Sequence, residues 1–193
     1  PHFLFNTLNS IYALIDRGAG ERASAMLLNL SQFLRYSLEH GANRSVPLAE
    51  EVDAVKLYLA IEQVRFSDRL MVDFDVNEAV NDALVPSFLL QPLIENAIKH
   101  AIAQAEQGGS IRISGYATDD RLNLVVEDSG PDRRPDNQTA VVGSSVGLAN
   151  VRERVATLHG DRGQVILGES ALGGFRVNLS FPLVLGKAGD IDD

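Results

Sequence analysis

The chain has 193 residues, 45% of them hydrophobic, and a formal net charge of −9 at pH 7. A globular protein of this size can bury one good core and a smaller helical element, whereas the acidic balance argues against a nucleic-acid partner, which would require a basic face. The absence of cysteine excludes disulfides and thiolate metal sites and suits a reducing cytoplasm.

Apolar spacing predicts three helices in the first third of the chain, over residues 3–16, 21–39 and 47–66. The first two form a helical hairpin. In the first helix the apolar residues step by 4, 3 and 4 positions, which is typical of a bundle helix: Leu4, Leu8, Ile11 and Ile15. His2, Asn6, Asn9 and Ala13 form the opposite stripe, so we expect the His2 imidazole to be presented to solvent or to another domain.

The rest of the chain alternates strands and helices. The predicted strands cover residues 70–76, 110–116, 122–128, 164–168 and 175–181, and the helices cover 86–104 and 148–159. Residues 129–147 have no periodicity and are predicted to form a mobile loop. Residues 186–193 form an acidic tail that we expect to be disordered.

The helix around residues 89–101 separates two chemistries. Its apolar face contains Leu90, Leu93, Ile94, Ala97 and Ala101. Glu95, Asn96 and Lys99 share the other face, with His100 at the border. A carboxylate and an amide oxygen suit Mg²⁺, and the cationic groups suit phosphate. The pattern indicates a nucleotide site, although an amphipathic surface helix would read the same way.

Two later segments extend the pattern. Residues 125–130 read as a buried strand that ends in the acidic turn Asp128-Ser129-Gly130, and residues 143–154 read as a glycine-rich loop that leads into a helix. The first turn of such a helix can hold phosphate through its backbone N–H groups.

In this order, residues 1–6 (Pro-His-Phe-Leu-Phe-Asn), residues 91–100 (Gln-Pro-Leu-Ile-Glu-Asn-Ala-Ile-Lys-His) and the two later segments resemble the H, N, G1 and G2 boxes of bacterial sensor histidine kinases of the LytS/YehU type. Their ATP-binding part is shared with the gyrase, Hsp90 and MutL ATPases. The resemblance runs from Pro1 to about Pro182. It implies an α+β fold: a helical hairpin for dimerisation and phosphotransfer over 1–66, then an α/β sandwich over 67–185 whose mixed sheet is covered on one face by helices.

The resemblance makes His2 the acceptor of the γ-phosphoryl group of ATP. Many kinases of the wider class place an acidic residue directly after this histidine, but this chain has Phe3. Glu95 is the candidate base, unless it helps to hold Mg²⁺ through water. Asn6 could orient a water for the reverse phosphatase reaction, or it could form hydrogen bonds in the bundle interface.

The resemblance also implies the ATP contacts. Asn96 would be the main Mg²⁺ ligand, Lys99 and His100 would lie toward phosphate, Asp128 would accept from the adenine amino group, and Gly130 would let the backbone approach the base. The phosphate loop would contain Gly143, Gly147 and Leu148. Arg152 and Arg154 would add positive potential, or they would belong to an exposed ion-paired helix face.

Two departures from the family pattern leave an alternative open. Asp132 and Ser145 stand where relatives commonly have glycine, and a replaced glycine in such loops costs about 1 kcal/mol or more. The alternative is a non-catalytic regulatory pseudokinase that dimerises and binds a response regulator. A free-standing ATPase lacks support, since such chains have no histidine-bearing helix ahead of the ATP part.

The kinase reading implies partners beyond the nucleotide. We expect a homodimer, because two helical hairpins can close a four-helix bundle that one cannot. The phosphoryl group would pass to an aspartate of a response regulator, which in this family often carries a LytTR DNA-binding domain. The chain starts inside a helix motif without an initiator Met. It therefore looks like a fragment, and the resemblance implies a cytoplasmic part of an inner-membrane protein whose upstream segment is absent.

Overall fold

The structure, a computed structural model, describes residues 2–41, 44–130 and 145–186. The helices are α1 (His2–Asp16), α2 (Gly20–Glu39), α3 (Leu48–Phe66), α4 (Gln91–Ala97) and α5 (Ser145–His159), and α4 continues as a π-helical turn, Ile98–Ile102. The strands are β1 (Ser45–Pro47), β2 (Leu70–Val76), β3 (Leu84–Pro86), β4 (Gly109–Thr118), β5 (Arg121–Asp128), β6 (Gln164–Glu169) and β7 (Phe175–Pro182). None of the helices in the described parts is long and apolar enough to cross a membrane.

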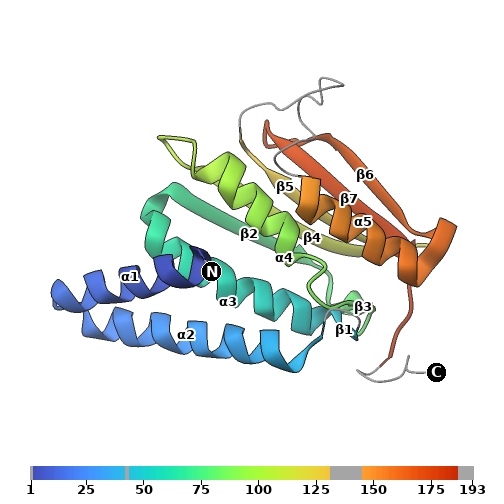
Figure 1. Ribbon diagram of the computed structural model, residues 1–193. Coiled ribbons are helices and arrows are strands. Elements are labelled where there is room, and N and C mark those ends of the chain that lie inside the picture. The colour runs from blue at the N-terminus through green and yellow to red at the C-terminus, as the bar shows by residue number, and fades with distance from the viewer. Residues whose placement is uncertain (1, 42–43, 131–144, 187–193) are drawn as a thin grey trace.

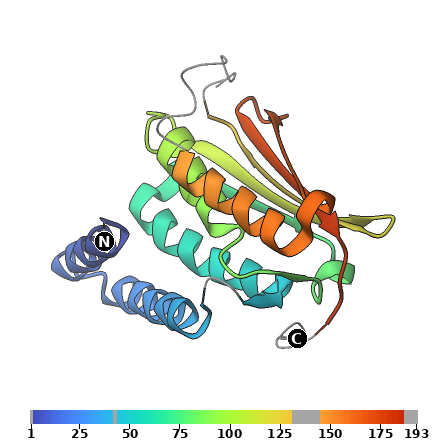
Figure 2. The same cartoon turned by 45° about the vertical axis from the view of Figure 1, so that its right-hand side comes forward.

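The architecture is a helical hairpin followed by a helix-covered mixed sheet (Figure 1). The five-stranded sheet has the order β2-β4-β5-β7-β6, in which β2 and β4 are parallel and all other neighbours are antiparallel. Figure 2 shows α4 and α5 side by side on one face of this sheet, with α3 next to them. The predicted α+β fold is confirmed.

The helical hairpin turns at Gly18, whose φ of +73° favours glycine. The N–H of Ala19 bonds back to the carbonyl of Leu14 at 2.8 Å, so the last carbonyls of α1 are satisfied. The two helices then pack through a small cluster that α3 completes: Ile11, Leu14, Ala23, Met26, Leu30 and Ile61.

The main core lies between the sheet and the helices. It includes Val52, Val55 and Leu59 of α3, Leu93 and Ile94 of α4, and Val151 and Val155 of α5. Phe33 of α2 also belongs to this core. Because α3 contributes to both clusters, the helical hairpin and the sheet share one helix as their common support.

The predicted apolar stripe of the first helix is only partly buried. Ile11 is buried, but Leu4, Leu8 and Ile15 are exposed, and the face that packs in this chain consists of Phe3, Thr7, Ile11 and Leu14. In the second helix, α2, some of the apolar residues are likewise exposed: Leu27, Leu34 and Leu38. Both helices carry more than one apolar face, so spacing alone did not identify the face that packs within the chain.

Several predicted boundaries differ from the structure, and α5 begins at Ser145, within the predicted loop of residues 129–147, instead of at residue 148. The segment before the third helix contains strand β1, which pairs with β3 in a two-stranded sheet that the sequence did not reveal. The site helix begins at Gln91 instead of residue 86, because β3 ends at Pro86 and Phe88 takes a left-handed φ of +56° that breaks any helix there. Beyond the site helix, Gly108 has a φ of +78° and lies against the Arg69 backbone.

Candidate nucleotide and phosphotransfer site

The start of α1 places the candidate acceptor. His2 is the first residue of α1, and its neighbour Phe3 packs between two aromatic rings, with centroid distances of 5.6 Å to Phe33 and 5.0 Å to Tyr58. Asn6 lies one turn later and is half-buried, and its carbonyl accepts from the Ser10 hydroxyl at 3.0 Å. The position after His2 is thus occupied by a packing residue.

The residues predicted for the polar face of the site helix lie on its more exposed side. On α4, Glu95 is exposed and accepts from the Gln91 side-chain amide at 2.7 Å, and Asn96 is half-buried. Lys99 is exposed and His100 is half-buried, and both lie in the π-helical turn. Such turns are rare and occur frequently at functional sites.

Glu95 lies close to α3. Burial raises the pKa of Tyr58, and the charges of Glu62 and Glu95 raise it further. Burial also raises the pKa of Glu62, and Glu95 acts in the same direction, whereas the ion pair with Arg65 opposes it. Phe3 packs on the same Tyr58 ring, so the residue next to His2 contacts a tyrosine on which the charge of Glu95 also acts.

The residues expected to contact adenine lie in a tight turn after β5. Asp128 is buried, and its Oδ1 accepts from the N–H of Gly130 at 2.9 Å and of Phe175 at 3.2 Å. A Cβ on Gly130 would lie 2.6 Å from the Ala101 Cβ, so glycine is required for close packing against the π-helical turn. This contact brings the turn after β5 to the site helix.

The predicted phosphate loop is described only at its end. Gly143 lies outside the described residues, as does most of the predicted loop, including Asp132. Gly147 lies in the first turn of α5, where a Cβ would be 3.5 Å from the Pro92 Cβ of α4. The next residue, Leu148, packs partly buried against the main core.

The two arginines of α5 differ in their surroundings. Arg152 is exposed, which fits both a role in binding phosphate and an exposed helix face. Arg154 instead donates to the backbone carbonyls of Ser87 and Phe88, so its guanidinium holds the turn ahead of α4. This contact explains Arg154 as a residue that joins α5 to the site helix.

Sequence reasoning missed two kinds of site residue. Glu51, which the sequence did not single out, is 1% exposed and accepts hydrogen bonds from the turn before α4. Gly174 lies against Asp128, where a Cβ would be 2.3 Å from Oδ1. The acidic pair Glu50-Glu51 and the pair Gly173-Gly174 were the signals in the sequence, and neither indicates its distant partner.

Two family profiles match the chain. The first, described as histidine kinase, matches residues 1–70, and the second, described as histidine kinase-, DNA gyrase B-, and HSP90-like ATPase, matches residues 81–185. The sensor protein LytS of Enterococcus faecalis is 36% identical over 191 residues, which is 95% of this chain. The chain belongs to the sensor histidine kinase family.

Other relatives agree. This kinase chain is 39% identical to the sensor histidine kinase YpdA of Escherichia coli over 83% of its length. It covers 32% of the Enterococcus faecalis relative and 29% of YpdA, so it spans about a third of the length of the curated relatives it matches. Its ATPase-family part implies ATP binding.

Solved structures support the fold of this kinase chain. The catalytic domain of histidine kinase ThkA has a TM-score of 0.58 at 17% identity and covers 74% of this chain and 97% of its own. The histidine kinase domain of the Erythrobacter litoralis blue-light activated kinase EL346 has a TM-score of 0.54 at 19% identity, covering 84% and 73%. Nothing in the comparisons favours the alternative of a non-catalytic pseudokinase.

Proposed function

We propose that this chain is the catalytic part of a sensor histidine kinase that transfers the γ-phosphoryl group of Mg·ATP to His2. The observation that carries the proposal is a shared core: Phe3, next to His2, packs on Tyr58 of α3, and Leu93 of the site helix belongs to the same core cluster. An acceptor helix and a nucleotide helix that share one core suit a transfer that depends on positioning.

The described residues fit a Mg²⁺-bound nucleotide. Asn96 and Glu95 offer hard oxygen atoms on one helix turn, although the Glu95 carboxylate also accepts from Gln91. Lys99, His100 and Arg152 would lie toward the phosphates, together with the backbone of Gly147 and Leu148. When bound, Mg²⁺ would neutralise charge on the phosphate oxygens. Asp128 and Gly130 would hold the adenine.

His2 would attack as a neutral imidazole. Its nitrogen forms the bond to the γ-phosphorus while the bond to the leaving ADP oxygen breaks. Because Phe3 is engaged in packing, the proton must pass to another group, and we assign this role to Glu95. Asn6, one turn after His2, would orient a water in the reverse phosphatase reaction.

The proposal extends to the whole protein. Residues 1–66 would form the dimerisation and phosphotransfer segment and residues 67–185 the ATP-binding domain. The phosphoryl group would pass on to an aspartate of a response regulator, which we expect to be of the LytTR type. The chain would be the cytoplasmic part of a protein that an upstream segment anchors in the bacterial inner membrane.

Nucleotide binding and phosphotransfer can be tested separately. Asn96→Ala should weaken Mg·ATP binding strongly in calorimetry, because loss of an oxygen ligand leaves triphosphate charge uncompensated. The exposed Asn9→Ala is the matched control and should bind normally. Unchanged binding by Asn96→Ala would contradict the metal assignment.

His2→Gln should bind Mg·ATP like the wild type but accept no label from γ-labelled ATP. In the wild type the label should be lost in acid, as a phosphohistidine is, and should then appear on the response regulator. Acid-labile label on His2→Gln would show that another residue is the acceptor.

A further inference from the structure

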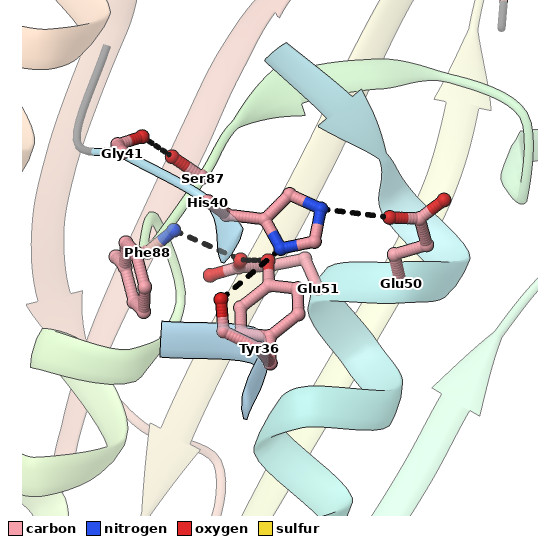
Figure 3. A network of polar contacts seen from close by, with 7 residues as sticks. All are labelled: Tyr36, His40, Gly41, Glu50, Glu51, Ser87 and Phe88. Atoms are coloured by element: carbon pink, nitrogen blue, oxygen red, sulfur yellow. Dashed lines mark hydrogen bonds and ion pairs between the residues drawn. The ribbon is translucent and has the colours of Figure 1, made fainter. Parts of the chain in front are cut away.

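The carboxylate of Glu51 lies at the meeting point of three helices (Figure 3). Glu51 belongs to the first turn of α3 and is 1% exposed. Its Oε1 accepts from the Leu90 N–H at 2.8 Å, and its Oε2 accepts from the Phe88 N–H at 2.9 Å and from the Tyr36 hydroxyl at 2.8 Å. Both oxygens of this buried group are therefore used.

The two N–H groups stand at the start of the site helix. The first N–H groups of a helix lack partners within it, and a carboxyl oxygen from another element can accept from them. Leu90, the N-cap residue of α4, provides no side-chain cap. Glu51 supplies the missing acceptor from another helix. Because α4 has only 7 residues, such tertiary contacts decide where it lies.

The turn ahead of α4 is held on several sides. Phe88 has a φ of +56°, a conformation that a non-glycine residue keeps only where its surroundings fix it. Its N–H donates to Glu51, and its carbonyl accepts from Arg154 of α5 at 3.2 Å. The start of the site helix is thus bound to both α3 and α5.

The same turn is joined to the helical hairpin. The Tyr36 ring of α2 packs edge-on against Phe88 at a centroid distance of 5.4 Å, and its hydroxyl donates to Glu51. Burial and the neighbouring Glu51 raise the pKa of Tyr36, so the hydroxyl keeps its proton and can donate. Just beyond α2, the Gly41 carbonyl accepts from the Ser87 hydroxyl at 2.7 Å.

We propose that Glu51 is a positioning residue for the nucleotide site and that Tyr36 couples this residue to the helical hairpin. Glu51 fixes the start of α4, and Asn96 and Glu95 lie one turn further along that helix. A shift of α2 would reach the nucleotide site through the hydrogen bond of the Tyr36 hydroxyl to Glu51, and the ring contact with Phe88 holds Tyr36 in position for it. The proposal rests on the proposed function, because it takes α4 as the nucleotide helix.

The first test compares two neighbouring substitutions. Glu51→Gln removes at least one acceptor, because a side-chain amide nitrogen cannot accept, so Mg·ATP binding should weaken by about tenfold. Glu50→Gln is the matched control: Glu50 is half exposed and forms only a 3.4 Å contact with His40, so affinity should change by no more than about twofold. Equal affinity of Glu51→Gln and the wild type would overturn the positioning role.

Hydrogen exchange reports on the cap itself. Without nucleotide, at least one of the Phe88 and Leu90 amides should exchange about tenfold faster in Glu51→Gln than in the wild type or Glu50→Gln, because one of these N–H groups loses its acceptor. Unchanged exchange at both amides would contradict the capping role whether or not the chain binds ATP.

The second test concerns Tyr36. Coupling is reciprocal, so Mg·ATP binding should slow exchange at the last turn of α2, where the His40 N–H donates to the Tyr36 carbonyl. Tyr36→Phe keeps the ring but removes the hydroxyl. This nucleotide-dependent change should disappear in Tyr36→Phe while ATP affinity stays within about threefold, because only one hydrogen bond is removed. Tyr12→Phe, the same change at an exposed tyrosine, should retain it.

The outcomes separate this proposal from the proposed function. A wild-type chain that binds no Mg·ATP would contradict the kinase function itself. Wild-type binding with a nucleotide-dependent change that persists in Tyr36→Phe would leave the kinase intact and overturn only the coupling.

Discussion

At the scale of residues, the site region contains a buried carboxylate whose surroundings disfavour its charge. Glu62 is 2% exposed, and burial and Glu95 raise the pKa of its carboxyl above the ordinary 4.5, while Arg65 acts in the opposite direction. The folded chain therefore binds a proton at this carboxyl more readily than the unfolded chain does. Such a group stabilises the fold at low pH, and this contribution is lost as pH rises through the raised pKa.

Substitution of Glu62 tests whether this carboxyl lowers the stability of the fold as pH rises. Glu62→Gln is neutral at every pH, so at pH 7 the variant should gain stability relative to the wild type. The gain should shrink as pH falls through 4.5, because well below that value the carboxyl is protonated in both states. Urea unfolding midpoints across this pH range measure the difference. The exposed Glu106→Gln should show no such trend, and a pH-independent difference for Glu62→Gln would contradict the burial argument.

At the scale of elements, the turn between β6 and β7 supports the end of β5. Gly174 lies so close to that end that a Cβ would meet Asp128 Oδ1 at 2.3 Å and the Gly130 nitrogen at 2.5 Å. The next residue, Phe175, donates its N–H to Asp128. The adenine end of the proposed site is thus shaped by a turn 46 positions further along the chain.

A methyl group at this turn should disturb the site. Gly174→Ala must displace Asp128 or the turn, at a cost of about 1 to 3 kcal/mol in stability. Adenine nucleotide affinity should fall by about tenfold, because Asp128 would leave its place. Gly168→Ala is the control, since a Cβ there meets nothing within 4 Å. Calorimetry with ATP on both variants decides the matter, and normal affinity of a folded Gly174→Ala would contradict the adenine assignment of Asp128.

At the scale of the whole molecule, the helical hairpin carries apolar side chains that its own chain does not cover. The exposed set on α1 and α2 is Leu4, Phe5, Leu8, Tyr12, Ile15, Leu27, Leu28, Leu34 and Leu38. An apolar surface of this extent marks an interaction site. Two hairpins from two copies could bury it in a four-helix bundle, which supports the proposed homodimer.

Charged residues introduced on this apolar surface should weaken the proposed homodimer. In sedimentation experiments, Phe5→Glu combined with Leu28→Glu should weaken self-association by about hundredfold or more, because two buried apolar contacts would be replaced by unpaired charges. The monomers should remain folded, since both side chains are exposed in the single chain. Met71→Glu, at an exposed apolar residue of β2, is the control. A stable dimer in the double variant would place the interface elsewhere.

Much of this protein follows from local sequence. The period of apolar residues predicted the helices and the five strands of the main sheet, with boundaries near those observed, and the opposed faces of residues 90–101 were correct. These features depend on neighbours within a few positions, which is the range over which periodicity and propensity act. The motifs of residues 1–6 and 91–100 also sufficed to identify the kinase family.

The tertiary structure alone decided how these parts meet. Glu51 finds its backbone partners 37 and 39 positions away, and Asp128 is held by an N–H 47 positions away. Strands β1 and β3 have only 3 residues each, too short for a pattern, and exist because they pair. A local pattern states that a face is apolar or that a carboxylate is present. Which surface covers that face, and which N–H meets that carboxylate, depends on contacts made only when the chain folds.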